Sequence, residues 1–139
     1  MALDKQIANM VLTAFEAVQE IKGENVIGID LSEAQAYTDF VLVVSASNTR
    51  QAAALSDRVI EKISKDLKIS PLGVEGYDQC EWILIDFGDI VVHVFLDEIR
   101  QKYRLEDMWM QLNPLTEEDF EKKVLSLFDT SEKKESTEK

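Results

Sequence analysis

The stretch that decides the fold is Glu81-Trp82-Ile83-Leu84-Ile85-Asp86-Phe87-Gly88-Asp89-Ile90-Val91-Val92-His93-Val94-Phe95-Leu96. Its two apolar runs are separated only by Gly88-Asp89, and a two-residue loop with glycine first is typical of a type II′ β-hairpin. Such a loop fixes the register, so Phe87 should face Ile90, Ile85 should face Val92 and Ile83 should face Val94. The sequence therefore predicts two adjacent antiparallel strands.

The two faces of this hairpin differ in chemistry. One face is entirely apolar and is expected to pack in the core, because it consists of Ile83, Ile85, Phe87, Ile90, Val92 and Val94. The other face, here called the mixed face, carries Trp82, Leu84, Asp86, Val91, His93 and Phe95. Aromatic, acidic and imidazole groups on one face indicate a partly exposed and chemically specific surface.

The remaining elements follow from periodicity on both sides of the hairpin. Helical spacing of apolar residues predicts helices over 3–22, 49–68, 97–110 and 116–128, and β-branched runs predict strands over 26–31 and 40–44. The helix at 97–110 has Ile99, Tyr103, Met108 and Trp109 as its expected anchors. Strand, helix and returning strand suggest a crossover unit. We expect residues 73–76 to form a turn into the hairpin, and the polar tail 129–139 to be mobile.

Charge limits the kind of partner. The chain has 139 residues, with 15 Lys and Arg against 27 Asp and Glu, which gives a formal net charge of −12. This balance argues against direct binding of nucleic acid and against docking on an anionic membrane, because both need clustered positive charge. A basic partner is favoured instead.

Other features narrow the class of protein further. The one cysteine, Cys80, excludes an internal disulfide and fits a reducing cytosol. The apolar runs are too short to span a bilayer, and the first residues do not resemble a signal peptide. These features predict a cytoplasmic protein.

Candidate catalytic and metal-binding groups are sparse. His93 is the only histidine, and a hydrolytic triad would have to join it to Ser45 or Ser47 and an aspartate such as Asp86, without a nucleophile-elbow motif. Neither zinc-ligand spacing nor a phosphate-binding loop is present in the sequence. The residues therefore favour a structural or partner-binding role for His93, and we expect no catalytic residue, metal or cofactor.

The segments around the hairpin resemble the ribosomal silencing factor family, also called the Iojap-like proteins. The resemblance covers about residues 3–113 and is carried by Thr38-Asp39-Phe40-Val41, Ser45 to Gln51, Val74-Glu75-Gly76, the hairpin at 81–95, and Arg100, Tyr103, Leu105, Glu106, Met108 and Trp109. It implies an α/β fold with a mixed β-sheet flanked by helices, related to the nucleotidyltransferase fold. The chain lacks that fold's Gly-Ser turn and Asp-x-Asp pair, so two-metal phosphoryl chemistry would have no ligands.

The resemblance also implies a function. Members of this family attach to ribosomal protein L-fourteen of the large ribosomal subunit, block joining of the small and large subunits, and lower translation when nutrients are limiting. We expect the partner-binding residues to be Trp82, Leu84, Asp86, Asp89, His93 and Phe95, with Glu75, Arg100, Tyr103 and Trp109 as weaker candidates. The mixed face is also a candidate surface for a homodimer.

Two other functions remain open from the sequence. One is a small metal- or nucleotide-dependent enzyme that uses Asp86, Asp89 and His93, and the other is a self-associating scaffold that does not contact the ribosome. The expected organisation is a ribosomal silencing factor domain over 1–114, an amphipathic helix over 115–128 and a tail over 129–139.

Overall fold

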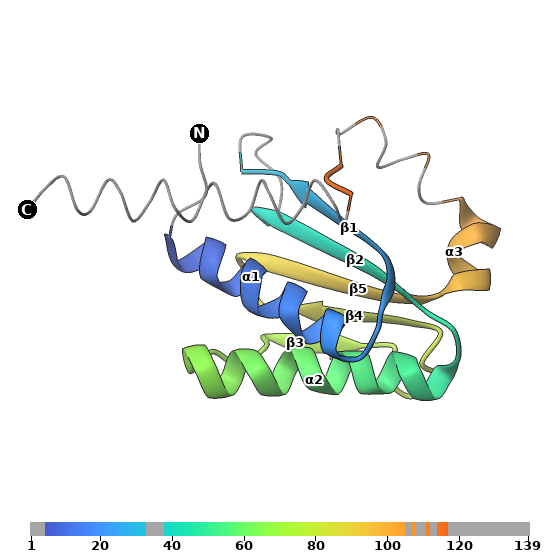
Figure 1. The fold of residues 1–139 in the computed structure, drawn as a ribbon, viewed down its shortest axis with the longest axis horizontal. Helices are drawn as coiled ribbons and strands as arrows, with labels where there is room; N and C mark the ends of the chain where they lie inside the picture. The colour runs from blue at the N-terminus through green and yellow to red at the C-terminus, as the bar shows by residue number, and fades with distance from the viewer. Residues whose placement is uncertain (1–4, 33–37, 105–106, 108–110, 112–113, 117–139) are drawn as a thin grey trace, which may run out of the picture.

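The computed structural model describes residues 5–32, 38–104, 107, 111 and 114–116, and within them the chain forms a mixed sheet with helices (Figure 1). The elements are α1 (Lys5–Glu20), β1 (Glu24–Asp30), β2 (Phe40–Ala46), α2 (Thr49–Leu67), β3 (Gly73–Glu75), β4 (Trp82–Asp86), β5 (Ile90–Leu96) and α3 (Asp97–Tyr103). The strands form a five-stranded sheet in the order β1-β2-β5-β4-β3. The expected α/β class with a mixed sheet is confirmed.

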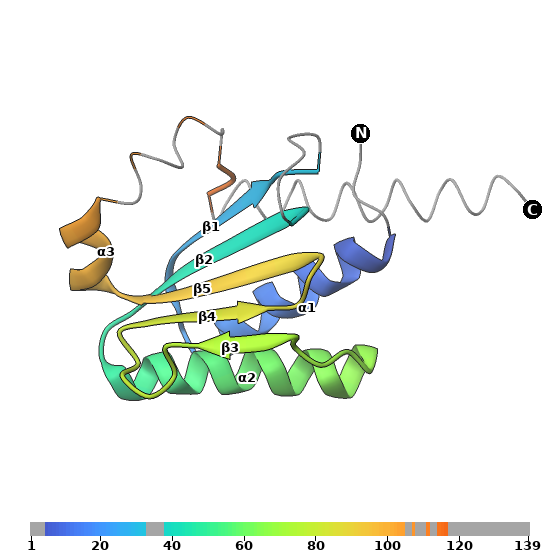
Figure 2. The ribbon, with the colours of Figure 1, turned by 180° about the vertical axis from the view of Figure 1, so that it is seen from behind.

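Helices α1 and α2 lie on the same face of the sheet, in front of the strands in Figure 1, and in the opposite view α1 lies behind the strands while α2 stays visible along the β3 edge (Figure 2). The main core lies in this layer, where the buried stripes of α1 and α2 meet the apolar face of the hairpin and alternate residues of β2. All seven residues of β2 are buried. This burial confirms the expectation that its β-branched run forms a central strand.

The hairpin has the register that its loop predicts. Ile85 pairs with Val92 and Ile83 with Val94, and the backbone N–H of Phe87 donates to the Ile90 carbonyl at 3.0 Å. Gly88 has a φ of +87°, as the first position of a type II′ turn requires. The six residues of the expected core face are all buried.

The segment before the hairpin differs from its prediction. Residues 73–75 form strand β3, which pairs antiparallel with β4 through Val74↔Ile85 and Glu75↔Leu84. Of the predicted turn, only Gly76 lies outside the strand, as a bend that leads into a turn at 77–79. The crossover that brings β5 parallel to β2 therefore contains α2 and the antiparallel strands β3 and β4. A strand of three residues is too short to show an alternating pattern in sequence.

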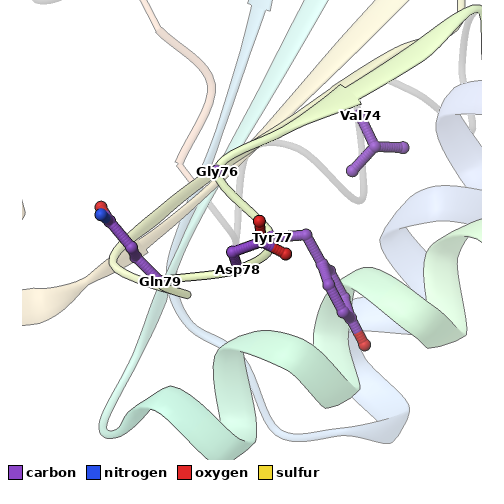
Figure 3. Close-up of a pocket in the computed structure, with 5 residues that line it drawn as sticks. All are labelled: Val74, Gly76, Tyr77, Asp78 and Gln79. Atoms are coloured by element: carbon purple, nitrogen blue, oxygen red, sulfur yellow. The ribbon is translucent and has the colours of Figure 1, made fainter.

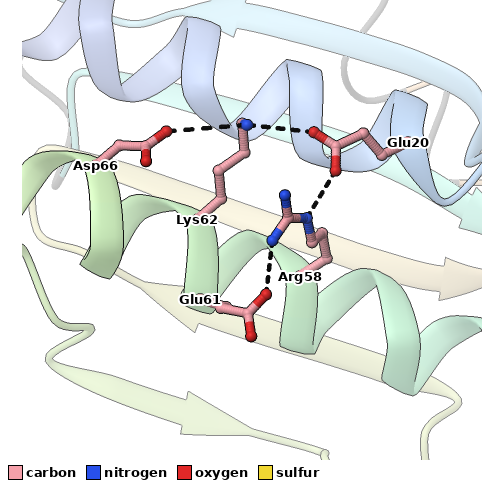
Figure 4. Close-up of polar contacts among 5 residues, drawn as sticks. All are labelled: Glu20, Arg58, Glu61, Lys62 and Asp66. Atoms are coloured by element: carbon pink, nitrogen blue, oxygen red, sulfur yellow. Dashed lines mark hydrogen bonds and ion pairs between the residues drawn. The ribbon is translucent and has the colours of Figure 1, made fainter.

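Helix α2 is capped and is joined to α1 by ion pairs. Its N-cap is Asn48, whose side-chain oxygen accepts from the backbone N–H of Gln51 at 2.8 Å. Figure 4 shows the ion pairs: Arg58 contacts Glu20 at 2.7 Å, and Lys62 contacts the other oxygen of Glu20 at 3.2 Å. The hydrogen bond from Arg58, followed by that from Lys62, lowers the pKa of Glu20. These contacts fix the alignment of two helices that cover the core.

The chain after β5 is tied back to the first strands. Helix α3 ends at Tyr103, where Arg104 takes a left-handed conformation with a φ of +51°, so this helix is shorter than predicted. Of its predicted anchors, Ile99 is half-buried, Tyr103 is 57% exposed and does not anchor the helix, and Met108 and Trp109 lie outside the described residues.

A short bridge involving Leu115 joins the end of the described chain to β1. The N–H of Leu115 donates to the Gly28 carbonyl at 2.7 Å, and the N–H of Gly28 donates to the Leu115 carbonyl at 2.9 Å. Apart from Leu115 and Thr116, the predicted C-terminal helix and tail lie outside the described residues.

Candidate partner-binding surface

Strand register places the mixed-face residues in rows across the sheet. Trp82 of β4 pairs with Phe95 of β5, and in the next row Leu84 pairs with His93. Glu75 of β3 pairs with Leu84, so its side chain lies on the same face as these hairpin residues. The structure thus brings together the aromatic pair, His93 and the acidic residue that the sequence placed before the hairpin.

Exposure on the mixed face rises from the centre of the sheet to its edge. His93 and Phe95 of β5 are buried, Leu84 of β4 is half-buried, and Trp82 of β4 is 40% exposed. The expectation of a partly exposed face therefore holds for β4 and is wrong for β5. The reason is strand order, because β5 lies between β2 and β4 and its side chains are packed from both sides.

Trp82 is held in place by the two buried rings of β5. Its indole Nε1–H donates to Nδ1 of His93 at 3.0 Å. The Trp82 and Phe95 ring centroids lie 4.7 Å apart at an interplanar angle of 40°, within the range of favourable aromatic pairs. His93 stacks on Phe95 at 5.8 Å with an angle of 9°. The exposed part of the indole is therefore presented from a fixed position.

Burial makes His93 a poor proton donor or acceptor for chemistry near neutral pH. Desolvation lowers the pKa of His93 from 6.5 to about 4. Because Nδ1 accepts the indole hydrogen, the neutral ring carries its proton on Nε2. The imidazole thus serves as a neutral acceptor that orients Trp82.

The two aspartates near the hairpin turn have different surroundings. Asp86 is half-buried, and its Oδ1 accepts from the backbone N–H of Gly88 at 2.8 Å, which stabilises the turn. Asp89 is exposed, while its backbone carbonyl accepts from the N–H of Asp39 at 3.0 Å. Thr38 donates from its hydroxyl to the Gly88 carbonyl at 3.0 Å. The segment at 38–39 therefore buttresses the hairpin turn and leaves the Asp89 side chain accessible.

The weaker sequence candidates separate into three groups. Glu75 is exposed at the edge of the mixed face, and Tyr103 is exposed on α3. Arg100 is only 2% exposed, and one of its nitrogens, Nη1, donates to the Asn25 carbonyl and to Ser45 Oγ, each at 2.8 Å. Arg100 thus fastens α3 to β1 and β2 and leaves little side-chain surface for a partner. Trp109 lies outside the described residues.

The structure also exposes apolar residues that the sequence did not single out. Leu72, which precedes β3 in the chain, is 77% exposed, and Tyr77, which follows β3, is 40% exposed. Together with Val74 they lie at the outer strand of the sheet, where Tyr77 and Val74 line a small cavity (Figure 3). In the sequence, Leu72 and Tyr77 are single apolar residues outside any regular repeat. An analysis of helical or strand periodicity therefore does not detect them.

The described residues do not assemble a metal-binding cluster. Among them, no group of three His, Cys, Asp or Glu side chains is placed to hold a metal ion. Asp86 is engaged with the turn, and the Nδ1 atom of His93 is engaged with Trp82. In the same part of the chain, no helix combines the length and apolar character needed to cross a membrane.

Comparison with known proteins gives a consistent result. The model of a family described as "Ribosomal silencing factor during starvation" matches residues 4–139. The ribosomal silencing factor RsfS of Chromobacterium violaceum is 35% identical over 104 residues, which cover 75% of this chain and 84% of that protein. A mouse protein named mitochondrial assembly of ribosomal large subunit protein 1 is 36% identical over 76 residues, or 52% of this chain and 33% of that protein.

A solved structure shares the fold. The crystal structure of a protein from Chromobacterium violaceum matches with a TM-score of 0.69 at 35% sequence identity. The match covers 74% of this chain and 85% of that chain. Sequence and fold therefore point to the same group of proteins.

Proposed function

This chain belongs to the ribosomal silencing factor family, and from that membership we propose that it binds the large ribosomal subunit, blocks joining of the small and large subunits, and represses translation under nutrient limitation. The family match over residues 4–139 is the observation that carries this proposal. The name of the mouse relative, which refers to assembly of the ribosomal large subunit, supports the choice of subunit. The proposed contact on that subunit is ribosomal protein L-fourteen.

The proposed contact surface is the exposed part of the mixed face. Trp82 has the properties of an interface anchor, because it is large, 40% exposed and held by His93 and Phe95 from below. Leu84 and Glu75 lie beside it in the next row, and Asp89 is exposed at the hairpin turn. In this proposal His93, Phe95 and Arg100 act from below the surface by holding exposed groups in place.

Charge supports a protein contact on a particle that is rich in RNA. With a net charge of −12, the chain is repelled by phosphate backbones and attracted to basic protein surface. This combination favours docking on a basic ribosomal protein and disfavours docking on the RNA around it.

The proposal describes a cytoplasmic binding factor that acts by occupying a surface. Steric exclusion of the small subunit requires no covalent chemistry, which agrees with the structural roles of the Asp86 carboxylate and of His93 Nδ1 in the described residues. A homodimer through the mixed face would cover the same residues, so it would compete with binding to the ribosome.

Cosedimentation with purified large subunits tests the proposal directly. We expect the protein to migrate with the large subunit at low salt, and protein that stays at the top of the gradient would contradict the proposal. Trp82→Ala should weaken binding by about tenfold or more, since anchor residues carry most of an interface's free energy. The control is Leu72→Ala, which removes a large exposed apolar side chain from outside the mixed face and should leave binding unchanged.

Subunit joining is the second step to measure. Adding the protein to large subunits before small subunits should reduce the fraction of joined ribosomes, and Trp82→Ala should restore it. If the protein binds large subunits without reducing joining, the proposed mechanism of repression is wrong while the binding stands. Size measurement of the protein alone and with ribosomal protein L-fourteen separates a competing homodimer from a stable one.

A further inference from the structure

The outer edge of the sheet at β3 exposes a group of apolar side chains. Leu72, Val74 and Tyr77, here called the edge patch, are 77%, 38% and 40% exposed. In the described part of the chain, only Trp82 and Tyr103 are other large apolar residues with comparable exposure. A concentration of exposed apolar surface at one edge marks a site of interaction.

The edge patch includes a small cavity with a fixed wall. The cavity has a volume of about 290 Å³ and is lined by Val74, Gly76, Tyr77, Asp78 and Gln79. Figure 3 shows the side chains of Val74 and Tyr77 on the side of the strand that faces α2. The Tyr77 hydroxyl donates to the carboxylate of Asp57 on α2, with 2.9 and 3.1 Å to its two oxygens, which holds the ring in place. The cavity is open to solvent and has room for an apolar side chain of a bound segment.

Strand β3 is also an edge strand, which is the position at which a sheet can pair with an additional strand. It is the last strand of the sheet in the described residues, with β4 on its inner side. The outer edge of such a strand presents backbone groups to which an extended peptide can pair.

The charge around this edge selects the sign of its partner. From Ile69 to Ile99 the chain contains seven acidic residues and neither lysine nor arginine. Glu75, Asp78 and Glu81 are exposed in this stretch. His93 adds no positive charge near neutral pH, because burial lowers its pKa to about 4. A positively charged segment is therefore attracted, whereas nucleic acid and anionic lipid are repelled.

The two faces of β3 differ in chemistry, so they favour a partner strand in which apolar and basic residues alternate. Val74 pairs with Ile85 and lies on the side of α2, while Glu75 pairs with Leu84 and lies on the mixed face. A strand added to β3 would place alternate side chains beside these two residues, because successive side chains point to opposite faces. Apolar residues would meet the edge patch and its cavity, and basic residues would meet Glu75.

We propose that β3 accepts an extended segment of a partner protein in which lysine or arginine alternates with apolar residues, and that this segment pairs with β3 as an added strand. One of its apolar side chains enters the cavity lined by Val74 and Tyr77. This site goes beyond the proposed function, because it requires no ribosomal particle and shares only Glu75 with the proposed ribosomal contact surface.

A synthetic peptide that alternates lysine and valine tests this site on the full chain. In amide-resolved NMR spectra of the labelled protein, the peptide should shift the signals of residues 72–79 and slow hydrogen exchange of amides in 73–75. A peptide that alternates glutamate and valine is the control for charge, and one that alternates lysine and glycine is the control for the apolar contacts. Shifts that map elsewhere, or equal binding of the glutamate peptide, would overturn the proposal.

Substitutions in the edge patch give an independent check. Leu72→Ser combined with Val74→Ser should reduce affinity for the lysine–valine peptide by about tenfold, because the apolar contact area is lost. Tyr103→Ser removes an exposed apolar side chain on α3 and should leave affinity unchanged. Glu75→Lys should weaken binding without removing any apolar contact. Unchanged affinity in both the Leu72→Ser/Val74→Ser variant and the Glu75→Lys variant, with the signals of the core strands intact, would contradict the site whatever the result with ribosomes.

Discussion

At the scale of single residues, the mixed face depends on one exposed ring and two buried ones. Trp82 reaches solvent only because β4 lies near the edge of the sheet, and its orientation is set by a hydrogen bond to a histidine that is buried. The sequence predicted which residues share this face, since alternation along a strand is a local property. It did not predict the burial of His93, because burial depends on which strands flank β5.

The buried imidazole should make stability depend on pH. The pKa of His93 is about 4 in the folded chain and 6.5 ordinarily, so the unfolded chain binds this proton more readily between those values. The stability that neutral His93 contributes is therefore complete above about pH 6.5 and is lost as pH falls toward 4. Between pH 7 and about 4.5, His93→Gln should lose roughly 2 kcal/mol less free energy of unfolding than the original protein.

Urea denaturation at a series of pH values, followed by tryptophan fluorescence, measures this difference. Glutamine is the informative replacement because its side-chain oxygen can still accept from the Trp82 indole without titrating. All other titrating groups are common to both proteins and cancel in the comparison. Parallel stability curves for the two proteins would show that His93 does not titrate between the folded and unfolded states as expected.

Gly76 should be the least replaceable glycine in the loop before β4. Its φ is +79°, and a Cβ atom there would lie 2.0 Å from the backbone oxygen of Trp82. Gly76→Ala should therefore cost roughly 2–4 kcal/mol through backbone strain and displacement of Trp82. Gly73→Ala is the matched control, since a Cβ at Gly73 meets nothing within 4 Å. Thermal and urea unfolding would contradict this prediction if both variants behaved alike.

At the scale of secondary-structure elements, the loops and helix ends determine strand register and helix length. The Gly88-Asp89 loop fixes the hairpin register, and this part of the fold was predictable because turn chemistry is local. Strand β3 was missed, because three residues at an edge take their structure from pairing with β4. The α3 helix is shorter than its apolar pattern because Arg104 ends it in a left-handed conformation.

The start of α2 allows a test of local stabilisation. Asn48 accepts from the N–H of Gln51 at 2.8 Å, which satisfies one of the backbone donors that a helix leaves free at its first turn. Asn48→Ala should lower the free energy of unfolding by about 1 kcal/mol. Asn48→Asp should retain most of the stability, because its carboxylate accepts the same hydrogen bond. Equal losses in urea unfolding for both variants would assign the effect to something other than the cap.

At the scale of the whole molecule, acidic charge is concentrated where the apolar residues are exposed. The half of the sheet made by β3, β4 and β5 lies within the stretch from Ile69 to Ile99, which has seven acidic residues and no lysine or arginine. Total charge was readable from the sequence, whereas its position beside Trp82 and the edge patch required the strand order. Much of the net negative charge of the chain is therefore located in the part that carries Trp82 and the edge patch.

The rate of association with large ribosomal subunits should depend on the position from which negative charge is removed. Replacing Glu75 and Glu81 by glutamine should slow association severalfold at low salt, and the difference should shrink as salt screens the field. Replacing Glu16 and Glu24 removes the same number of charges, from α1 and from β1 at the opposite end of the sheet. Stopped-flow binding that slows equally for both pairs would indicate that net charge alone controls the rate.

The bridge between Leu115 and Gly28 has a consequence for assembly. Leu115 occupies backbone groups on β1, so among the described residues the sheet is partly closed at one end while β3 remains open at the other. Growth of a filament by strand addition needs two available edges on every copy. The Leu115 bridge makes the β1 edge a poorer acceptor for an added strand than the β3 edge, so the fold can offer β3 for recognition while growth through β1 is disfavoured.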